Sequence, residues 1–267
     1  MFRKKIAILA LGAFSLTGLA ASASAADTLQ TIQQRGKIII GVDIAAPPYG
    51  MIDKNAKQTG FDIDAAHSLA KYLGVELQVV PVTGPTRIQF LRTNKVDAIM
   101  ASFSITDERK KVIDFSDPYA VVPIVVGGPK ADKVTSAKDL AGKAIAVTRG
   151  TTQDQAVTRS TKDVPNVTIV RYEDDSTTAT AILTGQQDYL FAASSVLPVI
   201  HEKDPKRDIE YKYTAVSFPM GVGLRQNDQK FKEKVNAWVA TNLKNGSLNE
   251  SYKKYFFGQS LPAEMLK

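Results

Sequence analysis

Apolar positions along the chain follow two periods, one typical of buried strands and one typical of amphipathic helices. Residues 37–42 form a short β-branched run after Gly36, which predicts a buried strand. Residues 62–73 repeat apolar side chains on one helical face and end at Gly74, where a helix favours glycine. Further elements predicted from the same patterns are strands over 76–82 and 96–101 and a helix over 87–93. This order of strands and helices indicates a parallel sheet with helices on its faces.

The same order of elements begins again after about residue 125, without a repeat of the sequence itself. The elements predicted there are strands over 143–147, 167–172 and 188–192, a helix opening after 150–152, and a helix over 174–184. The chain therefore contains two α/β units. An apolar stripe that includes Trp238, which we assign to the core, predicts a helix near the C-terminus. Ser247 and Glu250 predict a capping box at the start of a last helix.

The first 26 residues have the pattern of an export signal. Three basic residues, Arg3, Lys4 and Lys5, precede an apolar run over 6–19, and Ala23-Ser24-Ala25 fits a cleavage site. The apolar run is short for a membrane span, although a membrane anchor is the alternative. We predict a cleaved signal peptide over 1–26 and a periplasmic mature chain.

Composition excludes several classes of function. The sequence has no cysteine, which excludes disulfides, thiolate metal sites and cysteine nucleophiles. The formal net charge is +7, and the three basic residues of the signal reduce it to +4 for the mature chain. Its basic residues are scattered among acidic ones, so we expect no nucleic-acid partner.

Six short segments, in order, carry a resemblance to a known family. They are Gly60–Asp64, Asn94–Ala98, Ser104–Arg109, Asp114–Tyr119, Gly150–Thr152 and the ending from Asn245 to Phe256. In these segments the chain resembles the polar amino-acid (family 3) periplasmic solute-binding proteins of ABC importers. The resemblance covers essentially the whole mature chain. It implies a protein that captures a small carboxylate-bearing ligand, a polar or acidic amino acid, and delivers it to an ABC permease in the inner membrane.

The resemblance also implies an architecture: a two-lobed α/β fold of the type II, Venus-flytrap class with two crossing hinge strands. Lobe 1 would be discontinuous, over 27–120 and 221–267, and lobe 2 would span 121–220. The ligand would lie in the cleft, outside the carboxyl ends of the strands. We expect a monomer.

The resemblance places the main ligand contact at Arg109. In the family the arginine at this position holds the ligand's α-carboxylate, and a planar guanidinium can bind a carboxylate through two parallel hydrogen bonds. The alternative role is an ion pair with Glu108 or Asp114. Ser102 and Ser104 match positions that donate hydrogen bonds to the ligand, and on an extended backbone they face the same side.

Further candidates come from both halves of the chain. Thr151 and Thr152 open a predicted helix, where free N–H groups favour an anion. The resemblance implies that they close on the carboxylate, and ordinary N-capping is the alternative. Arg87 matches an arginine that meets the side-chain carboxylate in some binders of acidic amino acids. The other candidate cleft residues, which could equally be structural, are Arg149, Asp43 and Tyr49.

One expected group is missing. Most amino-acid binders of the family place an aspartate for the ligand's α-ammonium shortly after a Gly-x-x-Asp segment, and here that position is Ala193. An unpaired buried ammonium is unfavourable. Ser194 or Ser195 could supply a neutral acceptor, the alignment could be shifted, or the ligand could lack a free α-ammonium.

Two other classes of function were weighed. Some relatives of this fold are periplasmic dehydratases of prephenate-like acids, which need an acid or base in the cleft. The only histidines, His67 and His201, fall away from the cleft loops, so we predict no enzymatic activity, metal or cofactor. A signalling input domain would be tethered to an output domain, and we see none before the chain ends at Lys267.

Overall fold

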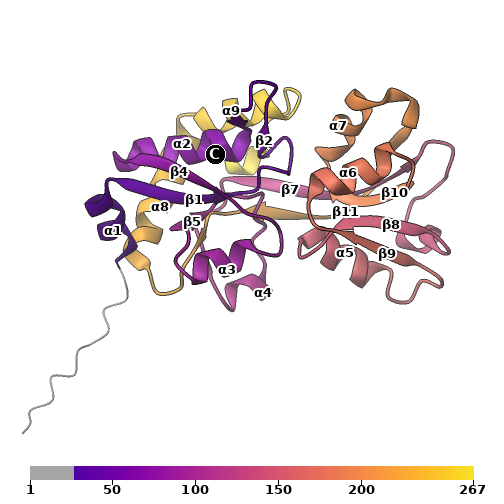
Figure 1. Cartoon of the computed structure of the whole chain (residues 1–267), viewed down its shortest axis with the longest axis horizontal. Coiled ribbons are helices and arrows are strands. Elements are labelled where there is room, and N and C mark those ends of the chain that lie inside the picture. Colours follow the sequence, from indigo (N-terminus) through magenta and orange to yellow (C-terminus); the bar gives the residue numbers. More distant parts are fainter. Residues whose placement is uncertain (1–26) are drawn as a thin grey trace, which may run out of the picture.

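The computed structural model describes residues 27–267, so the predicted signal peptide lies outside the described part of the chain. Two five-stranded sheets, each with its own helices, lie one after the other along the long axis of the molecule (Figure 1). Two long strands, β7 (Ala120–Pro129) and β11 (Ile209–Met220), run between these two lobes. This arrangement confirms the predicted two-lobed α/β fold. None of the helices within 27–267 has the length and hydropathy that a membrane span requires.

The first lobe is built on the sheet β4-β1-β5-β12-β6. Its strands are β1 (Lys37–Val42), β4 (Glu76–Pro81), β5 (Ala98–Ile99), β6 (Asp114–Phe115) and β12 (Gly223–Leu224). β1 is parallel to β4 and β5, as predicted, whereas β12 is antiparallel to both of its neighbours. Because β12 follows β11 in the chain and inserts beside β5, this sheet combines strands from both ends of the sequence.

Six helices and a small hairpin surround this first sheet. The helices are α1 (Thr28–Arg35), α2 (Phe61–Leu73), α3 (Arg87–Arg92), α4 (Asp107–Lys110), α8 (Gln229–Lys244) and α9 (Ser247–Tyr255), and the hairpin strands are β2 (Met51–Ile52) and β3 (Gln58–Thr59). Trp238 on α8 is fully buried, and its indole N–H donates to Ser68 Oγ at 3.1 Å, which confirms its place in the core.

The capping box predicted at Ser247 is wrong. Gly246, with a φ of 78°, is the N-cap of α9, and Ser247 is already inside the helix. The hydroxyl of Ser247 donates to Asn242 Oδ1 at 2.7 Å instead of capping the helix. The N–H of Ser247 donates to Asn245 Oδ1 at 2.9 Å, so the side chain that serves this helix start is that of Asn245.

The second lobe is built on the sheet β11-β7-β10-β8-β9. Its other elements are β8 (Ala144–Thr148), β9 (Thr168–Tyr172) and β10 (Tyr189–Ala193) with the helices α5 (Thr152–Ser160), α6 (Asp175–Leu183) and α7 (Val196–Lys203). β8, β9 and β10 are mutually parallel, as predicted, and β7 pairs antiparallel with both β10 and β11. The carboxyl ends of β8 and β10 therefore point to one edge, which faces the first lobe.

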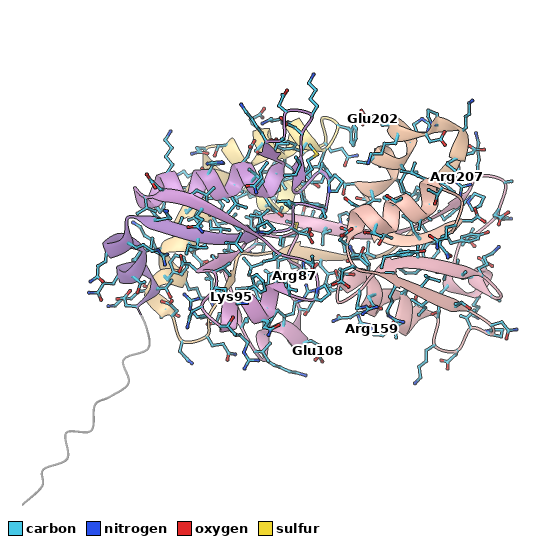
Figure 2. All side chains as sticks on the ribbon, in the orientation of Figure 1. Arg87, Lys95, Glu108, Arg159, Glu202 and Arg207 are labelled. Atoms are coloured by element: carbon cyan, nitrogen blue, oxygen red, sulfur yellow. The ribbon has the colours of Figure 1, made fainter. Side chains whose placement is uncertain are left out.

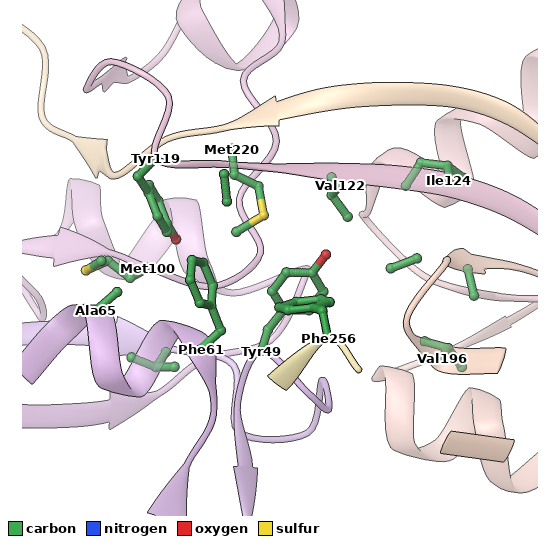
Figure 3. Close-up of a cluster of buried hydrophobic side chains, with 14 of the residues drawn as sticks. Tyr49, Phe61, Ala65, Met100, Tyr119, Val122, Ile124, Val196, Met220 and Phe256 are labelled. Carbon is green, nitrogen blue, oxygen red and sulfur yellow. The ribbon is translucent and has the colours of Figure 1, made fainter. Parts of the chain in front are cut away.

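A group of buried aromatic side chains anchors the crossing strands to the first lobe (Figure 3). The ring of Phe61 stacks on Tyr119 with centroids 5.9 Å apart, and Phe256 packs edge-on against Phe61 and against Tyr49. Val122, on β7, belongs to the same buried cluster. Burial of this kind contributes about 1.5–3 kcal/mol per large apolar side chain, so the cluster gives the interlobe region a rigid base.

Candidate ligand site between the lobes

Two buried arginines of the first lobe lie against the ring of Phe103. The guanidinium carbons of Arg87 and Arg109 are 4.5 and 4.7 Å from the ring centroid. Only 3% of Arg87 and 5% of Arg109 is exposed. Figure 2 shows Arg87 at the side of the first lobe that faces the second. The cation–π contact stabilises each positive charge by about 0.5–2 kcal/mol, which is small beside the loss of hydration.

Arg109 has no carboxylate partner in residues 27–267. Its Nη1 donates to the carbonyl of Ser104 at 2.8 Å. The ion pairs of the described chain do not include Arg109, and Glu108 instead pairs with Lys111 at 3.1 Å. Burial lowers the pKa of Arg109 well below its ordinary value, and repulsion from Arg87 lowers it further. The structural alternative, an ion pair with Glu108 or Asp114, is therefore not what the structure shows, and Arg109 is a buried cation that needs an anion.

Only part of the hydrogen-bonding capacity of the Arg87 guanidinium is used. Its Nη1 donates to the carbonyl of Ala101 at 2.8 Å, while its buried Nε has no hydrogen-bond partner. Burial lowers the pKa of Arg87, and the negative charges of Asp43, Asp175 and Asp62 oppose that effect. Within 27–267 no carboxylate comes close enough to Arg87 to form an ion pair. The guanidinium thus lies near enough to three carboxylates for their charges to act on it, without forming an ion pair with any of them.

The loop that carries Ser102 is held by a buried aspartate. Asp62, which is fully buried, accepts hydrogen bonds from the Ser102 N–H at 2.6 Å and the Tyr119 hydroxyl at 2.7 Å. Ser102 has a φ of 43°, so the extended backbone expected for 102–104 is wrong. The two serines therefore do not face one side by strand alternation. Ser104 is buried, and Ser102 is partly exposed.

The two lobes are in contact around this cluster. The hydroxyls of Ser104 and Thr152 are 3.0 Å apart, which joins the first lobe to the start of α5. On the opposite side, both the N–H and the hydroxyl of Ser176 donate to the carbonyl of Ala45 at 2.9 Å. These contacts join the two lobes at two places.

Thr151 and Thr152 have different roles. The Thr151 hydroxyl caps α5 by accepting from the Asp154 N–H at 3.2 Å, and it donates to the carbonyl of Thr148 at 2.6 Å. The side chain of Thr151 therefore has the alternative role given above, that of a helix N-cap. The Thr152 side chain faces Ser104, and both are buried.

The remaining predicted residues divide into buried and exposed groups. Asp43 is buried at the start of the loop after β1, and Tyr49 is buried against Phe256. Arg149 is exposed, and the structure does not bring its side chain into the buried cluster. Ser194 is partly exposed and its N–H donates to the carbonyl of Pro123 at 2.9 Å. The buried hydroxyl near this position is that of Ser195, which has no hydrogen-bond partner.

Asp175 was not among the residues that the sequence predicted for the site. This residue begins α6, and its carboxylate accepts a hydrogen bond from the hydroxyl of Thr148. Burial raises the pKa of Asp175. The sequence signal was ambiguous because Asp174 and Asp175 are adjacent at a predicted helix start, where either could be a cap. Asp174 is the N-cap, and the charge of Asp175 acts on Asp43 and Arg87 of the first lobe.

The arrangement contains no metal site within the described residues, since no group of three or more His, Asp or Glu side chains is placed to hold an ion. Both histidines, His67 on α2 and His201 on α7, are exposed. The cleft is therefore lined by arginines, aspartates and hydroxyl groups.

Comparisons with known proteins show which family this chain is similar to. The model of one family, described as bacterial extracellular solute-binding proteins, family 3, matches residues 38–259. A glutamine-binding protein of an ABC transporter from Bacillus subtilis is 30% identical over 258 residues, which cover 94% of this chain and 92% of the relative.

Solved structures are similar over most of the chain. The arginine-bound form of truncated ArgBP from T. maritima has a TM-score of 0.73 and 32% identity, covering 80% of this chain and 100% of that one. An ancestral amino acid-binding protein, described as a precursor of cyclohexadienyl dehydratase, has a TM-score of 0.77 and 34% identity, covering 86% and 99%.

Proposed function

The chain belongs to the bacterial extracellular solute-binding proteins of family 3, and we propose that it binds a polar amino acid between its lobes and delivers it to an ABC permease. Its relatives are amino-acid-binding proteins of transporters rather than enzymes. In this proposal, residues 1–26 direct the chain to the periplasm and are removed there.

One observation supports the proposal above all others: Arg109 is 5% exposed and lacks an anion within 27–267. A ligand α-carboxylate would supply that anion through charge-assisted hydrogen bonds, which are about twice as strong as neutral ones. Its hydrogen-bond donors would be Arg109 and the hydroxyls of Ser104 and Thr152. Because these groups belong to different lobes, only the closed arrangement satisfies the carboxylate fully.

The moving parts in this proposal are the two predicted lobes, 27–120 with 221–267 and 121–220. They would close as rigid bodies about β7 and β11, which connect the two sheets. A ligand can shift that equilibrium only by binding the closed form more tightly than the open one. The uncompensated charge of Arg109 makes the empty closed form unfavourable, so closure depends on the ligand.

A thermal-shift screen of residues 27–267 against the twenty amino acids and their deaminated and decarboxylated analogues tests this function. A ligand that binds only the folded state stabilises it by about 2.7 kcal/mol at a hundredfold excess over Kd. We expect a clear rise in melting temperature for at least one polar amino acid, and none for decarboxylated analogues. A protein that responds to no carboxylate, or that converts prephenate-like acids, would contradict the proposal.

Gly84 provides a test of closure. A Cβ added to Gly84 would lie 2.6 Å from the carbonyl oxygen of Arg149, which belongs to the other lobe. Overpacking of this kind destabilises a contact by about 1–3 kcal/mol, so Gly84→Ala should weaken ligand binding roughly 5- to 150-fold. Calorimetry measures the loss. The melting temperature of the ligand-free variant is the control, because the clash exists only when the lobes are closed.

A further inference from the structure

We propose that Asp175, together with Asp43, is the acceptor of the ligand's α-ammonium in this chain, in place of the carboxylate that is absent at Ala193. This inference rests on the proposed function, since it assumes that an amino acid occupies the cleft. It assigns to the start of α6 a role in ligand selection.

The geometry brings the two carboxylates together from different lobes. Asp43 follows β1 in the first lobe, and its Oδ1 accepts from the N–H of Ala45 at 3.0 Å. Ala45 in turn accepts, through its carbonyl, two hydrogen bonds from Ser176, the residue after Asp175. A short chain of contacts therefore holds both aspartates at the same point of the lobe interface.

The position of Asp175 also matches the position that lacks a carboxylate. The side chain of Asp175 accepts a hydrogen bond from the hydroxyl of Thr148, the last residue of β8. β8 pairs in parallel with β10, with Val147 opposite Phe191, so Thr148 lies one strand away from the end of β10, where Ala193 stands. Asp175 thus reaches the same edge of the sheet as Ala193, from the neighbouring strand.

The negative charges of Asp43 and Asp175 favour a cation between them. Within the described residues neither Asp43 nor Asp175 takes part in an ion pair. Burial raises the pKa of Asp43 to about 7; repulsion from Asp175 and Asp174 adds to this effect, while the Ala45 N–H and Arg87 oppose it. Burial likewise raises the pKa of Asp175, against the Thr148 hydrogen bond and the charge of Arg87. An ammonium between the two carboxylates would remove the repulsion that disfavours their ionised forms.

Two buried polar atoms near the cleft lack partners, which supports an absent ligand rather than a purely structural cluster. They are Arg87 Nε and Ser195 Oγ, in side chains that are 3% and 5% exposed. Buried polar groups in native proteins are nearly always hydrogen-bonded. The charges of Asp43 and Asp175 both act on Arg87, and Ser195 follows Ala193 by two positions in the chain.

The resulting site has two poles. Arg109, at one end, is influenced by Arg87 but by no aspartate, whereas Arg87 is influenced by Asp43 and Asp175. A zwitterionic amino acid fits this order, with its carboxylate at Arg109 and its ammonium at the aspartates. An acidic side chain placed near the aspartate pole would be repelled, so the inference narrows the ligand to amino acids with a neutral or basic side chain.

The experiment uses the mature chain and calorimetry with two matched pairs of probes. The pairs are L-glutamine with 4-carbamoylbutanoate and L-arginine with 5-guanidinopentanoate, which differ only in the α-amino group. In the wild type we expect the amino acid of a bound pair to bind at least thirtyfold more tightly than its deaminated analogue. Asp175→Asn should reduce that ratio to within about threefold, because it removes the charge and keeps the shape.

Two further variants separate a role in ligand binding from a role in folding. Asp188→Asn removes an exposed carboxylate that pairs with Arg207 at 2.9 Å, and it should leave both affinities unchanged. Asp175→Asn combined with Ala193→Asp should recover at least tenfold of the lost preference for the amino acid. If Asp175 had only a structural role, an aspartate at position 193 on β10 would not restore the preference for the amino acid.

Proton exchange gives an independent readout. An ammonium lowers the pKa of Asp43 from about 7, so amino-acid binding near pH 6.5 should release protons, seen as a dependence of the binding enthalpy on the buffer. Asp43→Asn should reduce that release. If the wild type binds each deaminated analogue as tightly as its amino acid, or if Asp175→Asn weakens both members of a pair equally, this inference is wrong while the proposed function stands. If no amino acid binds, either here or in the thermal-shift screen, both are wrong.

Discussion

We expect Arg109→Met to abolish detectable amino-acid binding, while the ligand-free variant should melt no lower than the wild type. The first result follows because removal of one partner of a buried, hydrogen-bonded ion pair costs about 2–5 kcal/mol, or roughly 30- to 5,000-fold in Kd. The second follows because Arg109 has no anion in 27–267 and because burial lowers its pKa well below the ordinary value. Methionine fills much of the same volume without a charge that must be desolvated.

Calorimetry and differential scanning on one preparation measure both effects. Arg159→Met is the matched control, since Arg159 is exposed on α5 and should change neither quantity. Arg109→Lys keeps the charge but loses the planar fork, so it should retain only weak binding. Binding of the Arg109→Met variant within threefold of the wild type would show that the carboxylate is held elsewhere.

Periodicity of apolar residues predicted most of the fold. The strand expected over 37–42 is β1, the helix expected over 62–73 is α2 with one residue added, and the helix over 174–184 is α6 within one residue at each end. These elements bury one face or one stripe, so the pattern alone specifies them. The strand expected over 96–101 is only Ala98–Ile99, because the chain there leaves the sheet to form the loop that carries Ser102.

Tertiary contacts account for what the sequence did not reveal. The φ of 43° at Ser102 depends on Asp62, forty residues earlier, so a local pattern cannot show it. Likewise, Asp175 looks like one of two aspartates at a helix start until Thr148 and Ala45 place it opposite Asp43. The resemblance to the family suggested Arg109, whose burial and missing partner emerged only from the structure.

The stability of the ligand-free protein should depend on pH through Asp62. Burial raises the pKa of Asp62 to about 6, from an ordinary value of 3.8, although the hydrogen bonds from Ser102 and Tyr119 oppose the shift. The folded state therefore holds the proton more tightly than the unfolded state. This contribution to stability is complete below about pH 4 and is lost as pH rises through 6, by about 3 kcal/mol in all.

The effect is isolated by comparing the wild type with Asp62→Asn across pH 4 to 8. The variant has no carboxyl to titrate at this position, so it lacks the pH dependence that Asp62 contributes. We therefore expect the free energy of unfolding of the wild type, measured relative to that of the variant, to fall by about 2.5 kcal/mol between pH 4 and 7. Because Asp62, Ser102 and Tyr119 all belong to the first lobe, opening of the cleft leaves these contacts unchanged.

Asp64→Asn, on the same helix, is the control for this comparison. Asp64 pairs with Lys254 at 2.8 Å near the surface, where such a pair contributes less than about 1 kcal/mol. A difference between the wild type and Asp62→Asn that stays constant from pH 4 to 8 would mean that Asp62 titrates as an ordinary carboxyl. In that case the loop at Ser102 is held by an ionised aspartate, whose hydrogen bonds outweigh its loss of hydration.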